Sequence, residues 1–304
     1  MNDLRIVTDA VADLPPELVA RWSITVAPVH ITLDGTTHTV TETASHDWLY
    51  NALTMQDEIR PQTSAPAVAD FVVLFRRLAD EGAKQIVGLF TASTVSSTAD
   101  HARLAARELH GVEVHIIETA QVSLGEGLLV LEAAQAAAAG ASPQEIAAQI
   151  ARLRQQTLIL GVLPSLTYLR RGGRVNGVLG LLGDLFRIKP IIFFYEGKAG
   201  LWSKVRTYRR AMEMLAPMVH PHRLRRLAVL HTRAPQQQVA EFHRRIVERF
   251  GDPAVPLLEA GPVFAAHIGP GALGLVFIGN ERLTERYPKL AAATAASDDP
   301  QGAL

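Results

Sequence analysis

The stretch QIVGLFTASTVSST (residues 85–98) contains the change from strand to helix that decides the fold class of the first half of the chain. Gln85–Phe90 is a short apolar run typical of a buried strand, and Ser97–His110 has the pattern of a helix. Val112–Ile117 is again strand-like. A strand, a helix and a further strand in this order predict neighbouring strands of a mainly parallel α/β sheet.

The same alternation extends outward on both sides of this stretch. Thr25–Leu33 is predicted to be one strand that ends at a turn around Asp34 and Gly35. A first helix is expected after Asp13, which would be its N-cap. A capping box at Ser142–Glu145 predicts the start of a helix that continues to about Gln156. The other elements predicted in this half are a strand over Leu4–Thr8 and helices over His46–Met55, Ala67–Asp80 and Gly125–Ala139.

The second half has more strands and fewer helices. Its predicted strands are Thr157–Val162, Pro190–Tyr195, Leu201–Val205, Leu227–His231, Ala254–Leu258 and Leu275–Ile278. Glu196–Gly200 predicts a hairpin, and helices are expected over Thr207–Met218 and Pro235–Phe250. We therefore expect an α/β domain over 1–157, a second α/β domain with a mixed or antiparallel sheet over 158–290, and a flexible tail over 291–304.

Composition excludes several classes of protein. The chain has 304 residues and no cysteine, so disulfide frameworks, thiolate metal sites and cysteine nucleophiles are excluded. Its 30 Lys+Arg balance 30 Asp+Glu, which argues against a general nucleic-acid binder. Residues 1–150 nevertheless hold 8 basic and 19 acidic residues, whereas residues 151–304 hold 22 and 11. The two halves are therefore opposite in charge.

The N-terminal sequence gives no sign of a secretory signal, because Asp3 stands where a signal peptide would be basic. The longest stretch without charged residues, Ala260–Asn280, contains repeated glycine and proline. We interpret it as loop, turn and strand instead of a membrane helix. A cytoplasmic protein, with at most transient membrane contact, is expected.

Two hydroxyl-rich segments each precede a predicted helix. Thr63 and Ser64 stand before the helix expected at Ala67, and Ser93 and Ser96 follow the strand that ends at Phe90. Helix starts carry partial positive charge, so hydroxyl donors beside them suit an anion. Taken singly, each segment also fits an ordinary helix cap. Two of them in one α/β domain favour convergence on one carboxylate or phosphate.

The second half contributes basic candidates. Arg170, Arg171 and Arg174 cluster in the glycine-containing segment LRRGGRVN (residues 169–176), which suits either an anion grip or a solvated basic turn. His267 precedes the turn GPG (residues 269–271) and is either an anion donor or a structural histidine.

Familiar catalytic motifs are missing. Gly269, Gly271 and Gly274 match G-x-G-x-x-G, but a strand follows them where a dinucleotide site needs a helix. The sequence contains no Walker A loop, no H-E-x-x-H and no G-x-S-x-G. Metal-dependent and triad hydrolase chemistry therefore have no support, and no cofactor is expected.

Taken together, these motifs resemble the DegV family of bacterial fatty-acid-binding proteins, which serve as acyl-carrying subunits of fatty acid kinase. The segments that carry the resemblance occur in order over most of the chain: Ile6–Pro15, Thr25–Pro28, Thr63–Pro66, Ser93–Thr98, Leu169–Arg174, Lys189–Pro190, Lys204–Arg206 and His267–Ala272.

The resemblance implies a DegV-like two-domain fold that holds a long-chain fatty acid in a buried tunnel between the domains. It also implies a carboxylate site, to which the matching residues are Thr63, Ser64, Ser93, Ser96 and His267. A separate ATP-dependent fatty acid kinase would phosphorylate the bound carboxylate to acyl phosphate, a step of phospholipid metabolism. The chain itself would be a lipid-binding subunit without catalytic residues, with the fatty acid as ligand and no cofactor.

Departures from the family pattern lie close to these residues. The chain has Ala10 and Val11 where the family commonly has serine or threonine, and Ser97 replaces a glycine of the serine loop. The family's Asp-Ser after the next strand is Glu118-Thr119 here. These differences bear on head-group geometry and on acyl preference.

Two other functions remain open from the sequence. One is a self-contained enzyme that acts on a small carboxylated or phosphorylated substrate, and the other is a regulatory protein that uses lipid as a structural filler. Under the leading interpretation, Arg170, Arg171, Arg174 and Arg206 help to dock the kinase or contribute to contact between the oppositely charged domains.

Overall fold

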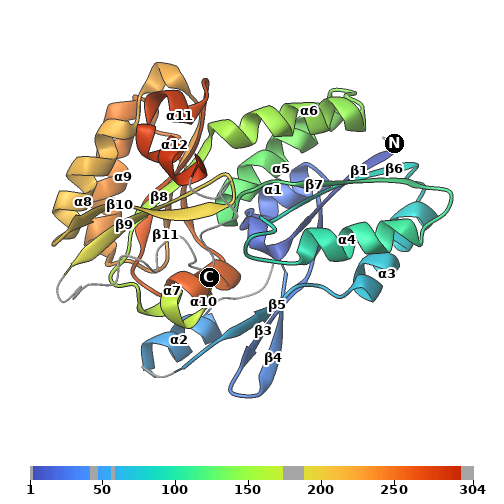
Figure 1. The fold of residues 1–304 in the computed structure, drawn as a ribbon, viewed down its shortest axis with the longest axis horizontal. Coiled ribbons are helices and arrows are strands. Elements are labelled where there is room, and N and C mark those ends of the chain that lie inside the picture. Colours follow the sequence, from blue (N-terminus) through green and yellow to red (C-terminus); the bar gives the residue numbers. More distant parts are fainter. Residues whose placement is uncertain (1–2, 42–46, 56–58, 174–187, 296–304) are drawn as a thin grey trace. The chain divides into compact units, whose positions relative to one another are not determined.

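A four-stranded parallel sheet forms the centre of the first half of the chain. The computed structural model describes residues 3–41, 47–55, 59–173 and 188–295 (Figure 1). The strands of this sheet are β1 (Leu4–Asp9), β2 (Thr25–Ala27), β6 (Gln85–Phe90) and β7 (Glu113–Glu118). Their order is β2-β1-β6-β7, and every neighbouring pair is parallel. The parallel α/β sheet predicted from residues 85–117 is thus confirmed.

Helices α3 (Val68–Asp80) and α4 (Thr98–Arg107) lie side by side and bury apolar residues with this sheet (Figure 1). Phe71 of α3 and Phe90 of β6 meet edge to face, with ring centroids 5.1 Å apart. Ala99 and Ala102 of α4 are fully buried in the same core. Small side chains on α4 allow close packing of the helix.

Helices α5 (Ser123–Ala138) and α6 (Pro143–Leu153) complete this part of the fold. Most residues of α5 are buried, including Glu126 and Glu132, and the sequence consists largely of alanine, leucine and glycine. The predicted capping box at the start of α6 is present, because the Ser142 N–H and hydroxyl both donate to Glu145 at 2.8 Å.

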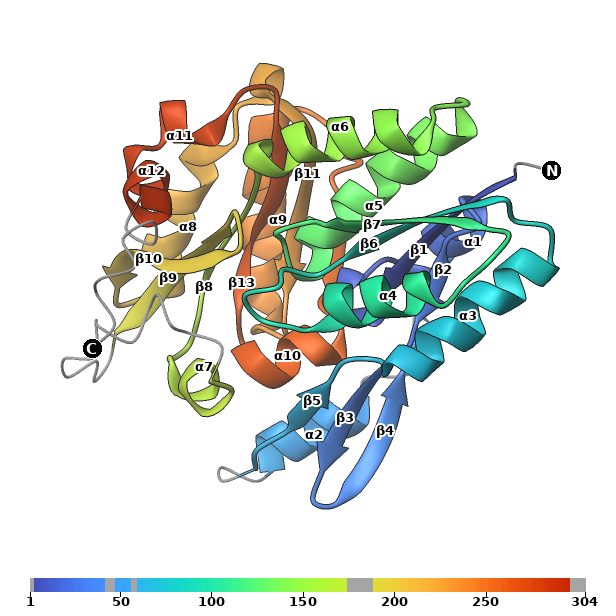
Figure 2. The same ribbon diagram turned by 45° about the vertical axis from the view of Figure 1, so that its right-hand side comes forward.

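A separate antiparallel sheet has the order β4-β3-β5 (Figure 2). It consists of β3 (Val29–Leu33), β4 (Thr36–Val40) and β5 (Gln62–Ser64), with α2 (Asp47–Met55) between β4 and β5 in the chain. The prediction of one strand over Thr25–Leu33 is wrong, because β2 ends at Ala27 and β3 begins at Val29. Pro28 separates them and has no N–H to donate to a ladder.

The second half forms a six-stranded mixed sheet in the order β10-β9-β8-β13-β11-β12. Its strands are β8 (Thr157–Val162), β9 (Lys189–Tyr195), β10 (Lys198–Val205), β11 (Leu224–His231), β12 (Leu257–Glu259) and β13 (Leu273–Gly279). All neighbouring pairs are antiparallel except β11 and β12. The predicted mixed sheet and the β9–β10 hairpin are confirmed, and the turn consists of Glu196 and Gly197, both at positive φ.

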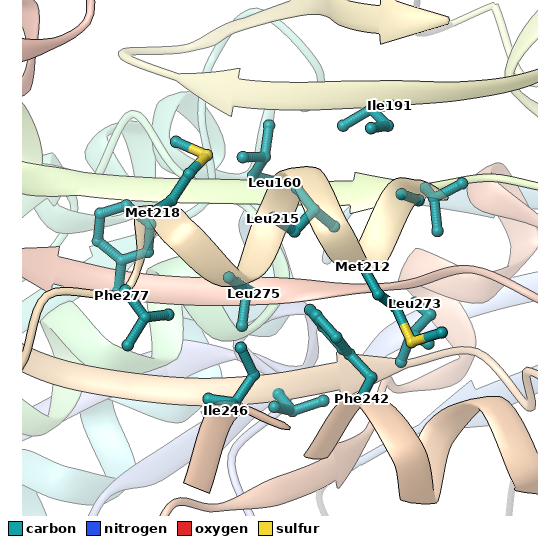
Figure 3. Packing of buried hydrophobic residues seen from close by; sticks show 14 of the residues in the cluster. Leu160, Ile191, Met212, Leu215, Met218, Phe242, Ile246, Leu273, Leu275 and Phe277 are labelled. Carbon is teal, nitrogen blue, oxygen red and sulfur yellow. The ribbon is translucent and has the colours of Figure 1, made fainter. Parts of the chain in front are cut away.

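Helices α8 (Tyr208–Leu215) and α9 (Gln236–Phe250) cover this sheet with apolar side chains. Figure 3 shows Leu215 of α8 near Leu160 and Leu275 of the sheet, with Phe242 of α9 beside them. All four residues are fully buried. Shorter helices in this half are α7 (Thr167–Arg171), α11 (Leu283–Arg286) and α12 (Pro288–Ala295).

The chain divides into two compact units with an unexpected boundary. The first unit is Met1–Leu153 together with Ala260–His267, and the second is Arg154–Glu259 together with Ile268–Leu304. The division expected from the sequence, 1–157 and 158–290, does not anticipate that residues 260–267 join the first unit. Residues 291–295, expected in a flexible tail, belong to α12, and the rest of that tail lies outside the described residues.

The segment that joins the first unit, residues 260–267, contains most of helix α10 (Pro262–Ile268). The interpretation of Ala260–Asn280 as loop, turn and strand is therefore wrong in part, because it misses this helix. Pro262 is the first residue of this helix, a position that tolerates proline, and glycine returns only after its end. Among the helices of the described residues, none is long and apolar enough to cross a membrane.

Asp13 is not the N-cap of the first helix. Helix α1 (Pro16–Arg21) has Pro15 at that position, and Asp13 has a left-handed backbone with φ of 50° after the short 3₁₀ helix Ala10–Ala12. The Ser123 hydroxyl donates to its carboxylate. The prediction that Asp13 caps the first helix is therefore wrong, and its carboxylate is hydrogen-bonded to Ser123 instead.

Asp13, whose Oδ1 atom is buried although the residue is only half-buried, lies near two fully buried acidic side chains, Asp9 and Glu126. Asp9 is fully buried, and burial raises its pKa to about 7 although the Val11 and Thr91 N–H groups favour its charged form. Glu126 of α5 is fully buried and accepts from the Thr8 hydroxyl at 3.1 Å. Burial and the neighbouring Asp9 raise the pKa of Glu126 well above its usual range. This region therefore favours protonated carboxyls.

The raised pKa of Asp9 predicts a specific pH dependence of stability. Between about pH 4 and 7 the unfolded chain loses this proton and the folded chain keeps it, so the free energy of unfolding falls as pH rises. Asp9→Asn removes this titration while keeping an acceptor for Val11. Urea unfolding at pH 4.5 and pH 8 measures this dependence. Between the two pH values the free energy of unfolding should fall less for Asp9→Asn than for wild type, and the two falls should differ by a few kcal/mol at most.

Asp34→Asn makes the same chemical change at an exposed turn and serves as the control. It should keep the wild-type fall in stability between the two pH values. An Asp9→Asn protein with the same pH slope as wild type would contradict the assignment.

Candidate functional site

Thr63 and His267 meet although they lie far apart in the sequence. The Thr63 Oγ1 and His267 Nε2 atoms are 2.9 Å apart, within one hydrogen bond. Thr63 is on β5 and His267 is near the end of α10, and both side chains are half-buried. Both residues belong to the first unit. One of the two groups donates to the other in this contact, so both can donate to an anionic oxygen only when their bond to each other is exchanged for bonds to the ligand.

The position of His267 depends on how α10 is held against the first unit. At the start of the segment, the Tyr50 hydroxyl donates to the Ala260 carbonyl at 3.2 Å. A Cβ atom on residue 261 would lie 2.1 Å from the Oδ1 atom of Asp13, so this position requires glycine. At the other end His267 meets Thr63. The seven residues of α10 are thus fixed at both ends.

Asp13 is itself held in a buried position. Its Oδ1 atom is buried, although other parts of the residue reach solvent. Burial raises the pKa of Asp13 to about 7, and the charge of Asp9 acts in the same direction. The Ser123 hydroxyl and the Gly261 N–H act in the opposite direction, because they favour the charged form. The sequence pattern predicted a helix cap at Asp13 and gave no sign of this role. The pairing with residue 261 depends on tertiary structure, which no local pattern shows.

Thr63 and Ser64 are on strand β5, and the helix expected just after them is present, but its N-cap position is Ala67, so neither residue caps it. Helix α3 begins at Val68, and its first turn is capped by Asp70, which accepts from the Ala67 N–H at 2.8 Å. Successive residues of a strand point to opposite faces, so Thr63 and Ser64 cannot face one ligand with both side chains. Ser64 is exposed.

Ser93 is hydrogen-bonded to Glu118, which was not among the site residues predicted from the sequence. Its N–H and its hydroxyl donate to the same oxygen, Glu118 Oε1, at 2.9 and 2.8 Å. Phe90 and Glu118 are register partners at the carboxyl ends of β6 and β7, which brings Glu118 beside the loop that follows β6. The parallel pairing of strands was the signal that could have indicated this contact.

Ser96 takes part in the turn that begins α4. Its Oγ atom lies 2.8 Å from Thr98 Oγ1 and accepts from the Thr98 N–H at 3.3 Å. Ser96 thus stabilises the turn just before α4, whose N-cap position is Ser97 and has no side-chain capping bond. His101 of α4 donates from Nδ1 to the Pro66 carbonyl at 2.8 Å and so links this helix to the segment that follows Thr63 and Ser64.

The structure therefore brings Thr63 and His267 together as one centre and Ser93 and Glu118 as another. Within the described residues, the hydrogen bonds of Ser93 and Ser96 stay in their own loop and the adjacent strand end. Both centres lie in the first unit. No group of three or more His, Asp or Glu side chains that could hold a metal ion occurs in the described part of the chain.

The basic candidates lie in the second unit. Arg170 and Arg171 end α7 and are exposed, and the Arg171 guanidinium lies 6.0 Å from the centre of the Tyr168 ring. Arg206 follows β10 and is also exposed. Arg174 lies outside the described residues.

The glycine turn after His267 is hydrogen-bonded to Thr232 and Tyr208 of the second unit, which were not among the residues predicted from the sequence. The Thr232 hydroxyl donates to the Gly269 carbonyl at 2.7 Å, and the Tyr208 hydroxyl donates to the Gly271 carbonyl at 2.6 Å. Gly269 and Gly271 both have positive φ, and Gly274 is in β13. The three glycines thus form a turn and a strand, without the helix that a dinucleotide site needs.

Comparison with known proteins supports the family named from the motifs. The family model described as an uncharacterised protein of the DegV family matches residues 3–280. A DegV domain-containing protein of Halalkalibacterium halodurans is 30% identical over 280 residues, which cover 90% of this chain and 98% of that protein.

Solved structures agree with this assignment. A fatty-acid-binding DegV family protein from Thermus thermophilus is 28% identical with a TM-score of 0.81, over 91% of this chain and 99% of that one. A fatty-acid-binding DegV family protein from Streptococcus agalactiae is 26% identical, also with a TM-score of 0.81 and the same coverage. The sequence match and the shared fold lead to one conclusion: the chain belongs to the DegV family.

Proposed function

We propose that this protein binds a long-chain fatty acid and holds its carboxylate at Thr63 and His267. The observation that carries the proposal is the 2.9 Å contact between the Thr63 hydroxyl and His267 Nε2, made across two elements of the first unit. The relatives from T. thermophilus and S. agalactiae, which are described as fatty-acid-binding, support the same ligand class.

The chemistry of these two side chains suits a carboxylate. A carboxylate removed from water needs hydrogen-bond donors, and the Thr63 hydroxyl and the His267 imidazole N–H supply them once their bond to each other is exchanged for bonds to the ligand. Burial of the acyl chain would supply most of the affinity, since each buried CH₂ contributes about 0.8 kcal/mol. The polar pair would then fix the orientation of the head group. The tunnel implied by the family resemblance remains part of this proposal.

The other hydroxyl residues contribute unequally to the proposed site. Ser93 is a further donor, provided that its bonds to Glu118 are exchanged for bonds to the ligand. Ser96 is engaged with Thr98, and Ser64 is on the strand face opposite to Thr63. We therefore assign the head group first to Thr63, His267 and Ser93.

We further propose that the bound carboxylate is presented to a separate ATP-dependent fatty acid kinase, which forms the acyl phosphate. The resemblance to acyl-carrying kinase subunits suggests this partner. The exposed Arg170, Arg171 and Arg206 are suited to contact it, because exposed guanidinium groups recognise carboxylates on a partner surface. The protein would thus supply substrate and orientation, and its partner would supply the nucleotide.

The first test is the lipid itself. Mass spectrometry of gently purified protein should detect a long-chain fatty acid, and delipidated protein should bind added acid. Protein that neither carries nor binds fatty acid would refute the proposed ligand. Hydrolysis or transfer from ATP by the protein alone would favour a self-contained enzyme.

The second test concerns the two head-group donors. Thr63→Val and His267→Phe should each weaken binding of fatty acid by about tenfold to a hundredfold, because a hydrogen bond to a charged group is lost. Titration calorimetry of delipidated protein measures the change. Thr39→Val is the matched control, because Thr39 Oγ1 lies 3.3 Å from His30 Nδ1 on an exposed part of the same small sheet. Equal losses in all three variants would remove Thr63 and His267 from the site.

The third test concerns the kinase. Arg206→Glu should lower the rate of acyl phosphate formation by the kinase and reduce the salt dependence of that rate, while fatty-acid binding stays unchanged. Arg107→Glu, an exposed charge reversal in the first unit, is the control. An Arg206→Glu protein that supports the wild-type rate with the wild-type salt dependence would exclude Arg206 from the docking surface.

A further inference from the structure

Glu118 occupies the two hydrogen-bond donors that Ser93 offers. The backbone N–H and the hydroxyl of Ser93 both point to Glu118 Oε1, at 2.9 and 2.8 Å. Two donors that converge on one carboxylate oxygen are the arrangement that an anionic ligand would use at this loop. In this structure a side chain of the protein itself fills that arrangement.

We propose that Glu118 is an internal competitor of the ligand, whose carboxylate blocks the Ser93 donors until the carboxylate of a fatty acid displaces it. This inference rests on the proposed function, because it assigns a role to one of the proposed head-group residues. It identifies Glu118 as the residue that sets how strongly the site prefers a charged head group over a neutral one.

The backbone around Glu118 is fixed, whereas its side chain can move. Glu118 ends β7 opposite Phe90, and the next residue, Thr119, donates its N–H to the Phe90 carbonyl at 3.0 Å and its hydroxyl to the same atom at 2.9 Å. The glutamate side chain itself is half-buried and has several rotatable bonds. It can therefore turn into water without disturbing the strand that carries it.

Ser93 cannot serve both carboxylates. While its hydroxyl proton points to Glu118, only the oxygen lone pairs are available to a ligand, and lone pairs repel a carboxylate. A second carboxylate at the same loop would also meet the negative charge of Glu118. At about 4 Å in water, two like charges weaken binding by roughly fivefold. A neutral alcohol, by contrast, can donate its own proton to Ser93 while Glu118 stays in place.

The variants Glu118→Gln and Glu118→Ala test this inference. Delipidated proteins are titrated with a long-chain fatty acid and with the fatty alcohol of the same chain length. Both variants should bind the acid about threefold to tenfold more tightly than wild type and bind the alcohol as wild type does. The part of the gain that comes from freeing Ser93 should be lost when Ser93→Ala is added to Glu118→Ala, so this double variant should gain less than Glu118→Ala does alone.

Glu113→Gln is the matched control, because Glu113 lies on the same strand, is exposed and is bonded to Gln85 and His115 away from Ser93. It should leave both affinities unchanged. Thermal melting of each variant shows that the fold is retained.

The outcomes separate the two proposals. If wild type and variants bind neither acid nor alcohol, the proposed function fails, and this inference fails with it. If wild type binds the acid and the Glu118 variants bind it equally well or more weakly, only the role of Glu118 is overturned. A gain for acid and alcohol alike would also overturn it, since competition for an anion would then not be the cause.

Discussion

The buried carboxyl of Asp13 is the point on which the geometry of the candidate site depends. It accepts from Ser123 at the start of α5 and lies so close to Gly261 that no side chain fits there. The corner after β1, the first turn of α5 and the entry to α10 therefore meet at one group. Because α10 carries His267, the contact with Thr63 depends on this arrangement. Burying a carboxyl is unfavourable; here the Ser123 hydroxyl donates to one oxygen of Asp13, and burial raises the pKa of the group to about 7, which favours its neutral form.

Local signals in the sequence predicted much of the fold. The apolar run Gln85–Phe90 and the capping box of Ser142 and Glu145 depend only on neighbouring residues, and the structure has both where they were expected. The parallel sheet of the first unit and the mixed sheet of the second followed from the order of such elements. Pro28 was visible in the sequence as well, but its effect of dividing one strand between two sheets became clear only from the pairing.

The candidate site was harder to predict, because its contacts join distant residues. Thr63 and His267 were both identified as candidates, yet their direct contact is a property of the tertiary fold. Glu118 was noticed only as a departure from the family pattern, since its contact with Ser93 arises from the register of two parallel strands. Gly261 and Pro262 were interpreted as helix breakers, whereas Pro262 begins a helix and Gly261 permits a close approach just before it.

The path of the chain has a consequence for how such a protein can be divided or can evolve. The chain passes from one unit to the other at residues 153–154, 259–260 and 267–268. A gene fragment that ends at residue 153 would encode Thr63, Ser93 and Asp13 but would lack His267. The two units are therefore not modules that recombination could exchange one at a time. With this connectivity, Thr63 and His267 stand in one chain only when residues 154–259 of the second unit lie between them.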